Sequence, residues 1–240
     1  MTDRTSLSYW FPILAQAGIP VPRTMAVHMP MSVQRFVFET ISGECPEKSD
    51  EAEEFLERLV RAGRKLGFPC FLRTDHTSGK HNWKDTCYWD EPSRAGAHVC
   101  AIAEYSELAG FPGLPWSRWV VRELLPTKQI GSCPNYGGMP LVRELRYFSK
   151  AGKIACRHPY WPEEALEQGG APLELHKDIT SFSDLGQADS IAEAAAKAIG
   201  GDWSIDLLET GRGWFVIDMA EAEKSYHWPD CATPTQGEDE

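Results

Sequence analysis

Two aspartates near the carboxyl end of the chain lie inside apolar runs and are the first candidates for chemistry. Asp206 lies in Ser-Ile-Asp-Leu-Leu and Asp218 in Val-Ile-Asp-Met-Ala. Burying a carboxylate without a partner is unfavourable, so proteins usually pair it or give it a cation. If the two runs form one hairpin, the aspartates can face each other and hold Mg²⁺, which prefers oxygen ligands. The alternative is that they accept backbone hydrogen bonds or bind an arginine.

A polar loop offers groups that bind phosphate. Pro69 to Arg73 is an apolar run typical of a buried strand, and small hydroxyls, a glycine and lysines follow it. Such donors build phosphate cradles, and a guanidinium matches phosphate bidentately. The P-loop pattern G-x-x-x-x-G-K-[ST] is absent, and an exposed loop without a ligand is the alternative. The candidate phosphate contacts are Arg73, Thr77, Ser78, Lys80 and Lys84.

A third charged segment contains Arg143, Glu144 and Arg146. In a strand, alternate residues share a face, so Glu144 lies with Arg146 and not with Arg143. These residues can form an ion-pair network across a hairpin or an arginine cluster for phosphate, and the sequence leaves both open. No histidine has a zinc spacing such as H-x-x-x-H, and no cysteine has the signature of a nucleophile, so neither zinc nor thiol catalysis is expected.

The elements that must position these groups follow from periodicity and turn signals. We expect helices over 6–18, from a capping box at Asp50 to Gly67, and over 189–199. Strands are expected over 33–38, 69–73 and 118–125, with a long loop at 127–140. Two hairpins are expected, one pairing 141–150 with 153–161 and the other pairing 203–209 with 214–221. Among nine tryptophans, those expected to anchor the core are Trp119, Trp203 and Trp214.

Length and composition narrow the class of protein. The 240 residues are enough for one large domain or two small lobes, and 42% of them are hydrophobic, as in globular chains. With 24 basic and 35 acidic residues the net charge is −11, which opposes a nucleic-acid partner. Seven scattered cysteines without C-x-x-C indicate a reducing compartment. No signal peptide and no membrane-spanning run is found, so we expect a cytoplasmic protein with no membrane partner.

In chain order, these segments resemble the ATP-grasp superfamily over roughly residues 10 to 228. Each motif is weak singly, but their order makes the set fairly specific. The segments that carry the resemblance are Ala17-Gly-Ile-Pro-Val-Pro-Arg-Thr24, Pro69 to Arg73, the loop Thr74 to Trp83, Val120-Val-Arg-Glu-Leu-Leu-Pro126, Glu144-Leu-Arg146, and the pair Asp206 and Asp218. The trio Arg143, Arg146 and Lys224 resembles a compact clade that includes the cell division cycle family of translation-factor assembly chaperones.

The resemblance implies an α+β fold in which two small lobes with antiparallel sheets sandwich ATP. It implies three regions, 1–120 with the phosphate loop, 121–228 as the carboxyl-terminal lobe, and an acidic tail over 229–240. Glu123, Leu124 and Leu125 would meet the adenine, Arg143 and Arg146 would serve catalysis, and Asp206 and Asp218 would bind Mg²⁺. The family usually has Asn two positions after the last acid, where this chain has Ala220, so Glu221 is a candidate replacement ligand.

The function implied is an ATP- and Mg²⁺-dependent carboxylate–amine ligase that acts through an acylphosphate. Its substrate would be a small-molecule or peptide carboxylate. The alternative is an ATP-binding assembly chaperone or regulatory module with a protein partner and no ligation. A metal-dependent nuclease is the third hypothesis, opposed by the −11 charge and by a missing acid-x-lysine triplet, since Ala222 precedes Glu223-Lys224.

Overall fold

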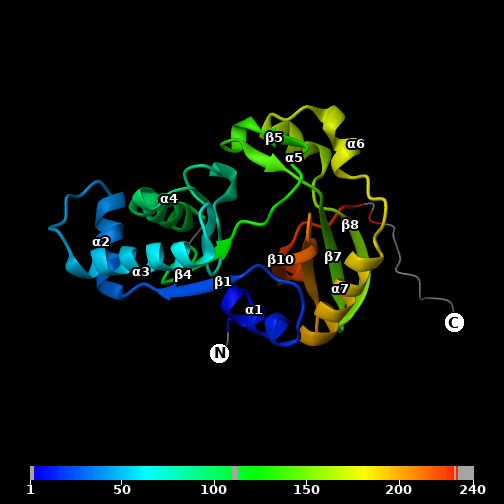
Figure 1. Cartoon of the computed structure of the whole chain (residues 1–240), viewed down its shortest axis with the longest axis horizontal. Coiled ribbons are helices and arrows are strands. Elements are labelled where there is room, and N and C mark those ends of the chain that lie inside the picture. The colour runs from blue at the N-terminus through cyan, green and yellow to red at the C-terminus, as the bar shows by residue number, and fades with distance from the viewer. Residues whose placement is uncertain (1–2, 110–112, 230, 232–240) are drawn as a thin grey trace. The chain divides into compact units, whose positions relative to one another are not determined.

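A computed structural model describes residues 3–109, 113–229 and 231. The chain divides into two compact units. Unit 1 comprises Met1–Pro22, Leu125–Asn135 and Pro140–Glu240, and unit 2 comprises Arg23–Leu124 and Tyr136–Met139 (Figure 1). Residues 1–22 thus group with the carboxyl-terminal part of the chain, whereas the sequence-based division kept 1–120 together. Apart from Pro229 and Cys231, the expected tail over 229–240 lies outside the described residues.

Unit 2 is a four-stranded antiparallel sheet packed with three helices. The strand order is β1-β4-β2-β3, with β1 at Thr24–His28, β4 at Arg118–Glu123, β2 at Cys70–Thr74 and β3 at Tyr88–Trp89. The helices are α2 (Met31–Ile41), α3 (Asp50–Leu66) and α4 (Ala95–Leu108). Two short 3₁₀ helices are η1 (Lys80–Asn82) and η2 (Pro92–Arg94). The strands expected over 69–73 and 118–125 are confirmed.

Helix α3 shows how closely local signals fix an element. Its amino-terminal cap is Ser49, whose hydroxyl accepts a hydrogen bond from Ala52 N at 3.2 Å. The cap therefore lies one residue before Asp50, where the sequence analysis expected it. Gly67 follows the last turn with φ = 93°, a conformation that glycine adopts without strain. Phe55 and Leu59, four residues apart, are buried on one face of the helix.

The strand expected over 33–38 is wrong, because this segment forms helix α2. Val33 and Val37 are both buried and lie four residues apart, which is a helical spacing. Arg35 and Glu39 form an i,i+4 ion pair at 2.8 Å on the same helix. The β-branched and aromatic content suggested a strand, but burial of one helical face against α3 and α4 overrides this weak preference.

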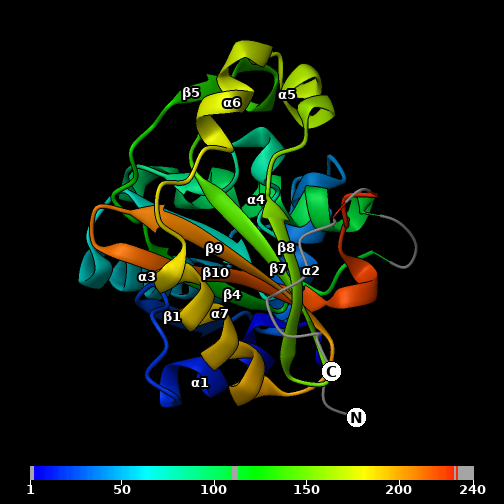
Figure 2. The ribbon, with the colours of Figure 1, turned by 90° about the vertical axis from the view of Figure 1, so that its right-hand side faces the viewer.

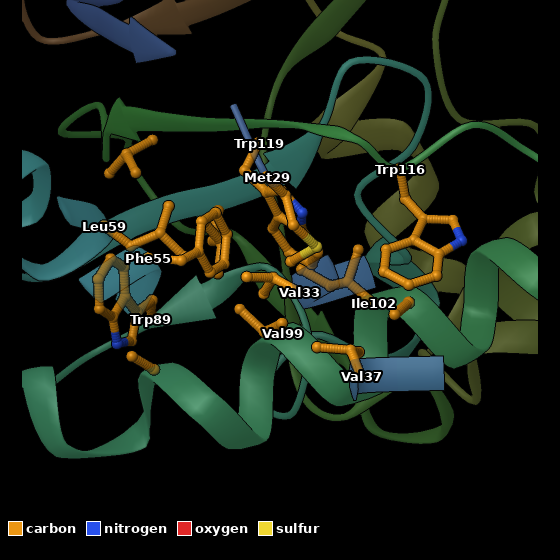
Figure 3. Close-up of a cluster of buried hydrophobic side chains, with 14 of the residues drawn as sticks. Met29, Val33, Val37, Phe55, Leu59, Trp89, Val99, Ile102, Trp116 and Trp119 are labelled. Carbon is orange, nitrogen blue, oxygen red and sulfur yellow. The ribbon is translucent and has the colours of Figure 1, made fainter. Parts of the chain in front are cut away.

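The core of unit 2 forms where the helices meet the sheet (Figure 3). Trp119 of β4 is fully buried, as expected from the sequence, and its ring lies edge-on to Phe55 of α3 at 6.2 Å. Val33 from α2 and Val99 and Ile102 from α4 also belong to the cluster. Aromatic rings bury large apolar areas, so this cluster holds the strand that ends at Glu123.

A buried histidine in this unit predicts acid sensitivity. His98 of α4 is fully buried, and its Nδ1 donates to Thr86 O at 2.6 Å. Burial lowers the pKa of His98 below its ordinary value of 6.5. The unfolded chain therefore takes up a proton below pH 6.5 that the folded chain excludes, so this contribution to stability is present above that pH and is lost as pH falls.

We expect the free energy of unfolding to fall between pH 7 and pH 5, with His98 contributing at most about 1.4 kcal/mol per pH unit. Urea unfolding at pH 7, 6 and 5 measures the slope. His98→Gln keeps a donor for the Thr86 carbonyl and should reduce this slope, whereas His28→Gln, at an exposed histidine, should not. Equal slopes for His98→Gln and the unmodified protein would contradict the prediction.

Unit 1 is built on a second four-stranded antiparallel sheet, with order β10-β9-β7-β8. Its strands are β7 (Glu144–Lys150), β8 (Lys153–Pro159), β9 (Trp203–Thr210) and β10 (Gly213–Glu221). Helices α7 (Gly186–Ile199) and α1 (Leu7–Gln16) pack against this sheet (Figure 2). Trp203 and Trp214 are buried, as the sequence predicted. The structure confirms both expected hairpins. It also confirms the helices expected over 6–18 and 189–199.

The turn between β7 and β8 shows why the first hairpin could be predicted. Ala151 and Gly152 have φ values of 51° and 77°, the left-handed pair of a two-residue hairpin turn. The loop expected over 127–140 is in part regular, since β5 (Gly131–Cys133) pairs with β6 (Met139–Leu141). Helices α5 (Glu163–Gly169) and α6 (His176–Ile179) follow β8. The two antiparallel sheets with helices confirm the expected α+β class.

Candidate functional site

A row of charged side chains crosses the sheet of unit 1. Asp206 of β9 lies opposite Arg146 of β7 on one side and opposite Asp218 of β10 on the other. Directly opposed residues in antiparallel strands project to the same face. The structure therefore brings Arg146 beside the pair Asp206 and Asp218, which the sequence singled out separately from that arginine. These three residues are called the charged row.

A β-bulge aims Asp218 at this face. The pairing of β10 with β9 shifts between Val216 and Asp218, which leaves Ile217 as an extra residue. Without the shift Asp218 would lie opposite Ile205, and its carboxylate would point to the other face of the sheet. Bulges often re-aim a side chain next to a functional site. The bulge thus creates the Asp206–Asp218 pair.

Asp206 is bound by Arg146 through both carboxylate oxygens. Arg146 Nε donates to Oδ1 at 2.7 Å and Nη2 donates to Oδ2 at 2.8 Å. The two side chains are only 13% and 9% exposed. Burial on its own lowers the pKa of Arg146, but the charge and hydrogen bonds of Asp206 outweigh it, so the pKa is raised and the arginine stays charged. The arginine partner that the sequence left open is therefore present.

Two further contacts fix the Arg146 side chain. Its Nη1 donates to the carbonyl of Tyr226 at 3.2 Å, and its guanidinium lies 4.7 Å from the centre of the Tyr160 ring. Neither tyrosine was a candidate in the sequence. A backbone carbonyl carries no residue signature, so only the fold could reveal the Tyr226 contact.

Glu221 is separated from the aspartate pair. It lies three residues after Asp218 on β10 and opposite Trp203, so it projects to the other face of the sheet. Its carboxylate is 3.8 Å from Arg4 Nε and accepts a hydrogen bond from Lys224 Nζ at 2.7 Å. Ala220 shares the face of Asp218 but offers no ligand atom. The structure does not bring Glu221 to Asp206 and Asp218.

Arg143 also lies apart from Arg146. Its Nε donates to Asp178 O at 3.1 Å, and its Nη1 is 3.5 Å from Glu209. Glu209 is three residues along β9 from Asp206 and therefore faces the opposite way. Arg143 belongs to an ion pair between neighbouring chain segments, which is one of the two readings that the sequence left open.

An apolar cluster lies on the same face as the charged row. Leu208 is two residues from Asp206 on β9 and shares its face. It packs with Leu125 and Val142, and Phe215 and Ile217 pack against these three. Leu125 was a candidate adenine contact, and the cluster gives it an apolar surface next to the acids.

The other two candidate adenine contacts lie at the end of β4 in unit 2. Glu123 is buried and accepts hydrogen bonds from Arg23 N at 2.9 Å and Arg23 Nε at 3.0 Å. Leu124 follows it and is partly buried. The carboxylate of Glu123 thus has a structural partner within its own unit.

The candidate phosphate loop is an ordered turn after β2. Arg73 is buried and its Nε donates to Thr74 O at 3.0 Å. Thr77 N donates to Thr74 Oγ1 at 3.0 Å, and Gly79 N donates to Thr77 Oγ1 at 3.3 Å. The two threonine hydroxyls therefore shape the loop itself.

The remaining loop candidates differ in exposure. Ser78 and Lys80 are partly buried, and Lys80 begins η1. Lys84 is exposed, with its side chain beside Gly138. Arg73 lies near the end of β2, and Ser78 and Lys80 follow it in the loop.

Comparisons with known proteins extend this description. No family model matches the sequence, and no curated protein matches it. Among solved structures the chain is similar to Cdc123 from Schizosaccharomyces pombe, with 15% identity, a TM-score of 0.54, and coverage of 90% of this chain and 82% of that one. At this identity the likeness concerns the fold alone, and it confirms the fold that the sequence motifs predicted.

Two further solved structures are similar at lower scores. One is a RimK domain ATP-grasp protein from Sphaerobacter thermophilus, with 15% identity, a TM-score of 0.48 and 90% of this chain covered. The other is D-alanine–D-alanine ligase from Bacillus anthracis complexed with ATP, with 13% identity, a TM-score of 0.46 and 91% of this chain covered. The chain spans 59% and 55% of their lengths.

In the described residues, no helix is both long and apolar enough to cross a bilayer.

Proposed function

We propose that this chain, which has the ATP-grasp fold, binds ATP with Mg²⁺ and uses it to activate a carboxylate for attack by an amine. The observation that carries the proposal is the row Arg146–Asp206–Asp218 on one face of the unit 1 sheet. Two carboxylates side by side supply oxygen ligands for a hard cation, and a buried arginine next to them supplies positive charge for phosphate.

The residues fit Mg²⁺ through Asp206 and Asp218, which lie opposite each other on β9 and β10. Bound Mg²⁺ would neutralise phosphate charge during transfer. Arg146 holds Asp206 through two hydrogen bonds, and a phosphate oxygen is an equivalent acceptor for the same guanidinium. Arg146 can therefore turn one N–H to the phosphate and release an oxygen of Asp206 for the metal.

The other contacts follow the chemistry of ATP. The apolar cluster of Leu125, Val142 and Leu208 offers a surface for the adenine ring, next to the charged row. Arg73, Thr77, Ser78, Lys80 and Lys84 remain the proposed phosphate contacts of unit 2, and Glu123 and Leu124 the proposed adenine contacts there. The resemblance also implies a catalytic role for Arg143, but its ion pair with Glu209 lies away from Arg146, so no step proposed here depends on it.

The reaction proposed is a phosphoryl transfer followed by an acyl transfer. A substrate carboxylate oxygen attacks the γ-phosphorus, ADP leaves, and an acylphosphate forms. An amine then attacks the acyl carbon, phosphate leaves with the bonding electrons, and the amine loses a proton. Phosphoryl transfer depends on positioning and charge neutralisation, which Arg146, Asp206 and Asp218 would provide. The substrate class is a small-molecule or peptide carboxylate.

A second function, ATP binding without ligation, is favoured by a specific observation. Arg146 uses both oxygens of Asp206, and Ala220 offers no further ligand beside Asp218. Fewer protein ligands would hold Mg²⁺ less firmly, and phosphoryl transfer depends on the metal for charge neutralisation, so turnover would be lowered. In this case the chain is an assembly chaperone or regulatory module that acts on a protein partner.

An ADP-release screen separates the two functions. The protein is incubated with MgATP and pairs of carboxylates and amines drawn from amino acids, peptides and small acids. Ligation predicts ADP release that needs both members of a pair and falls at least about tenfold in Asp218→Asn, in line with loss of a charged contact. Asp184→Asn, at an exposed aspartate that caps Gly186 N at 2.9 Å, should leave the rate unchanged. ATP binding without stimulation by any pair would support the second function and contradict ligation.

A further inference from the structure

Two cysteines and a histidine of unit 1 come together beside β8. Cys156 lies in β8, whereas His227 and Cys231 lie in the segment that follows η5 (Ala222–Lys224). Cys156 Sγ is 3.2 Å from His227 Nε2, and the ligand atoms of all three residues lie within 4.8 Å of one another. In the part of the chain that the structure describes, no other set of three or more histidines, cysteines and acids is gathered in this way.

The spacing of these atoms suits a tetrahedral metal ion. Zinc–sulfur bonds of about 2.3 Å and zinc–nitrogen bonds of about 2.0 Å place neighbouring ligand atoms roughly 3.5–3.8 Å apart. The observed sulfur–nitrogen distance of 3.2 Å differs from this by a few tenths of an ångström. Small rotations of the side chains would therefore complete the geometry.

Neighbouring residues position His227 and Cys231. The His227 ring stacks on Phe148 at 4.1 Å with an interplanar angle of 29°, and on His158 at 5.6 Å with an angle of 20°. Cys231 N donates to Trp228 O at 3.1 Å, which closes a turn at Pro229. Packing that fixes the ring plane and the turn lowers the entropy lost when a ligand binds.

We propose that Cys156, His227 and Cys231 bind Zn²⁺, with a fourth position open to water. Two thiolates and an imidazole select zinc over Mg²⁺, which prefers the oxygen atoms of Asp206 and Asp218. The site is thus chemically distinct from the proposed magnesium site and does not depend on ATP binding. The sequence analysis expected no zinc because no histidine has a zinc-binding spacing such as H-x-x-x-H. The ligands proposed here come instead from β8 and from a segment 71 residues later in the chain.

The site would fasten the segment after η5 to the sheet. Tyr226, next to His227, accepts a hydrogen bond from Arg146 Nη1 at 3.2 Å. The metal would therefore stabilise the backbone that contacts Arg146, the arginine of the charged row. A ligand that binds only the folded chain also raises its melting temperature.

Cobalt(II) is a direct probe, because thiolate ligation to Co²⁺ gives an intense charge-transfer absorption that oxygen ligands do not. Tag-free protein, stripped of metal and kept reduced, is titrated with Co²⁺ and then with Zn²⁺ as competitor. We expect one Co²⁺ per chain with the thiolate band, displaced by Zn²⁺, and a rise in melting temperature with Zn²⁺. Absence of the thiolate band with the thiols reduced would overturn the proposal.

Matched variants locate the site. Cys231→Ser and His227→Ala should weaken Co²⁺ binding by more than about 100-fold, since even outer-shell changes weaken metal sites by about 10- to 100-fold. His227 is exposed, so its alanine variant should fold, which circular dichroism checks. Cys45→Ser, at an exposed cysteine, and His28→Ala should bind as the unmodified protein does. Equal affinity in all of these proteins would show that the metal binds elsewhere and would overturn the assignment.

Discussion

Arg146→Met is expected to lower the free energy of unfolding by about 3–5 kcal/mol. The reason is the burial of the pair: with Arg146 removed, the Asp206 carboxylate loses two hydrogen bonds at 2.7 and 2.8 Å while it remains only 9% exposed. Asp206→Leu should be destabilising to a similar extent because it leaves the guanidinium unpaired. Urea unfolding at neutral pH measures both changes.

The double variant Arg146→Met/Asp206→Leu distinguishes a lost pair from lost packing. Apolar replacement of both partners of a buried ion pair is often neutral or stabilising, so its stability should return to within about 1 kcal/mol of the unmodified protein or exceed it. Arg35→Met is the control, since Arg35 is 82% exposed in its pair with Glu39 and such pairs contribute less than about 1 kcal/mol. Additive losses in the double variant would contradict this account of the pair.

The elements that sequence predicted are those with strong local signals. The hairpin of β7 and β8 follows from alternation on either side of Ala151-Gly152, and α3 follows from its caps and the spacing of Phe55 and Leu59. Helix α2 was mistaken for a strand because Val33 and Val37 fit either period over six residues. Strands β5 and β6, three residues each, are too short to show a period.

For the candidate site, the sequence could name residues but could not give most of their contacts. The aspartate pair required only the β9–β10 hairpin, but the register that joins it depends on the bulge at Ile217, which alternation along the strand does not reveal. The partner of Asp206 is 60 residues away in sequence, so the arginine could be named only as one alternative. His227 and Cys231 have the spacing H-x-x-x-C, a local signal that becomes informative once Cys156 is placed beside them.

Asp218→Asn is expected to weaken binding of MgATP by about 10- to 100-fold, which corresponds to about 1.5–3 kcal/mol for the loss of a charged interaction. The amide preserves the shape of the side chain and an oxygen that can accept the hydrogen bond from Met219 N, now 3.1 Å from Oδ1. The fold should therefore be retained, with an unchanged circular dichroism spectrum and a change of less than about 0.5 kcal/mol in the free energy of unfolding. Asp184→Asn is the matched control and should bind MgATP normally.

The central claim is that the charged row binds ATP through Mg²⁺. Its most direct test is calorimetric titration of ATP. Three titrations are compared: the unmodified protein with Mg²⁺, the same protein with a chelator in place of Mg²⁺, and Asp218→Asn with Mg²⁺. The proposed site predicts one ATP per chain in the first titration and at least tenfold weaker binding in the other two. Equal affinity in all three titrations, or no binding in the first, would contradict it.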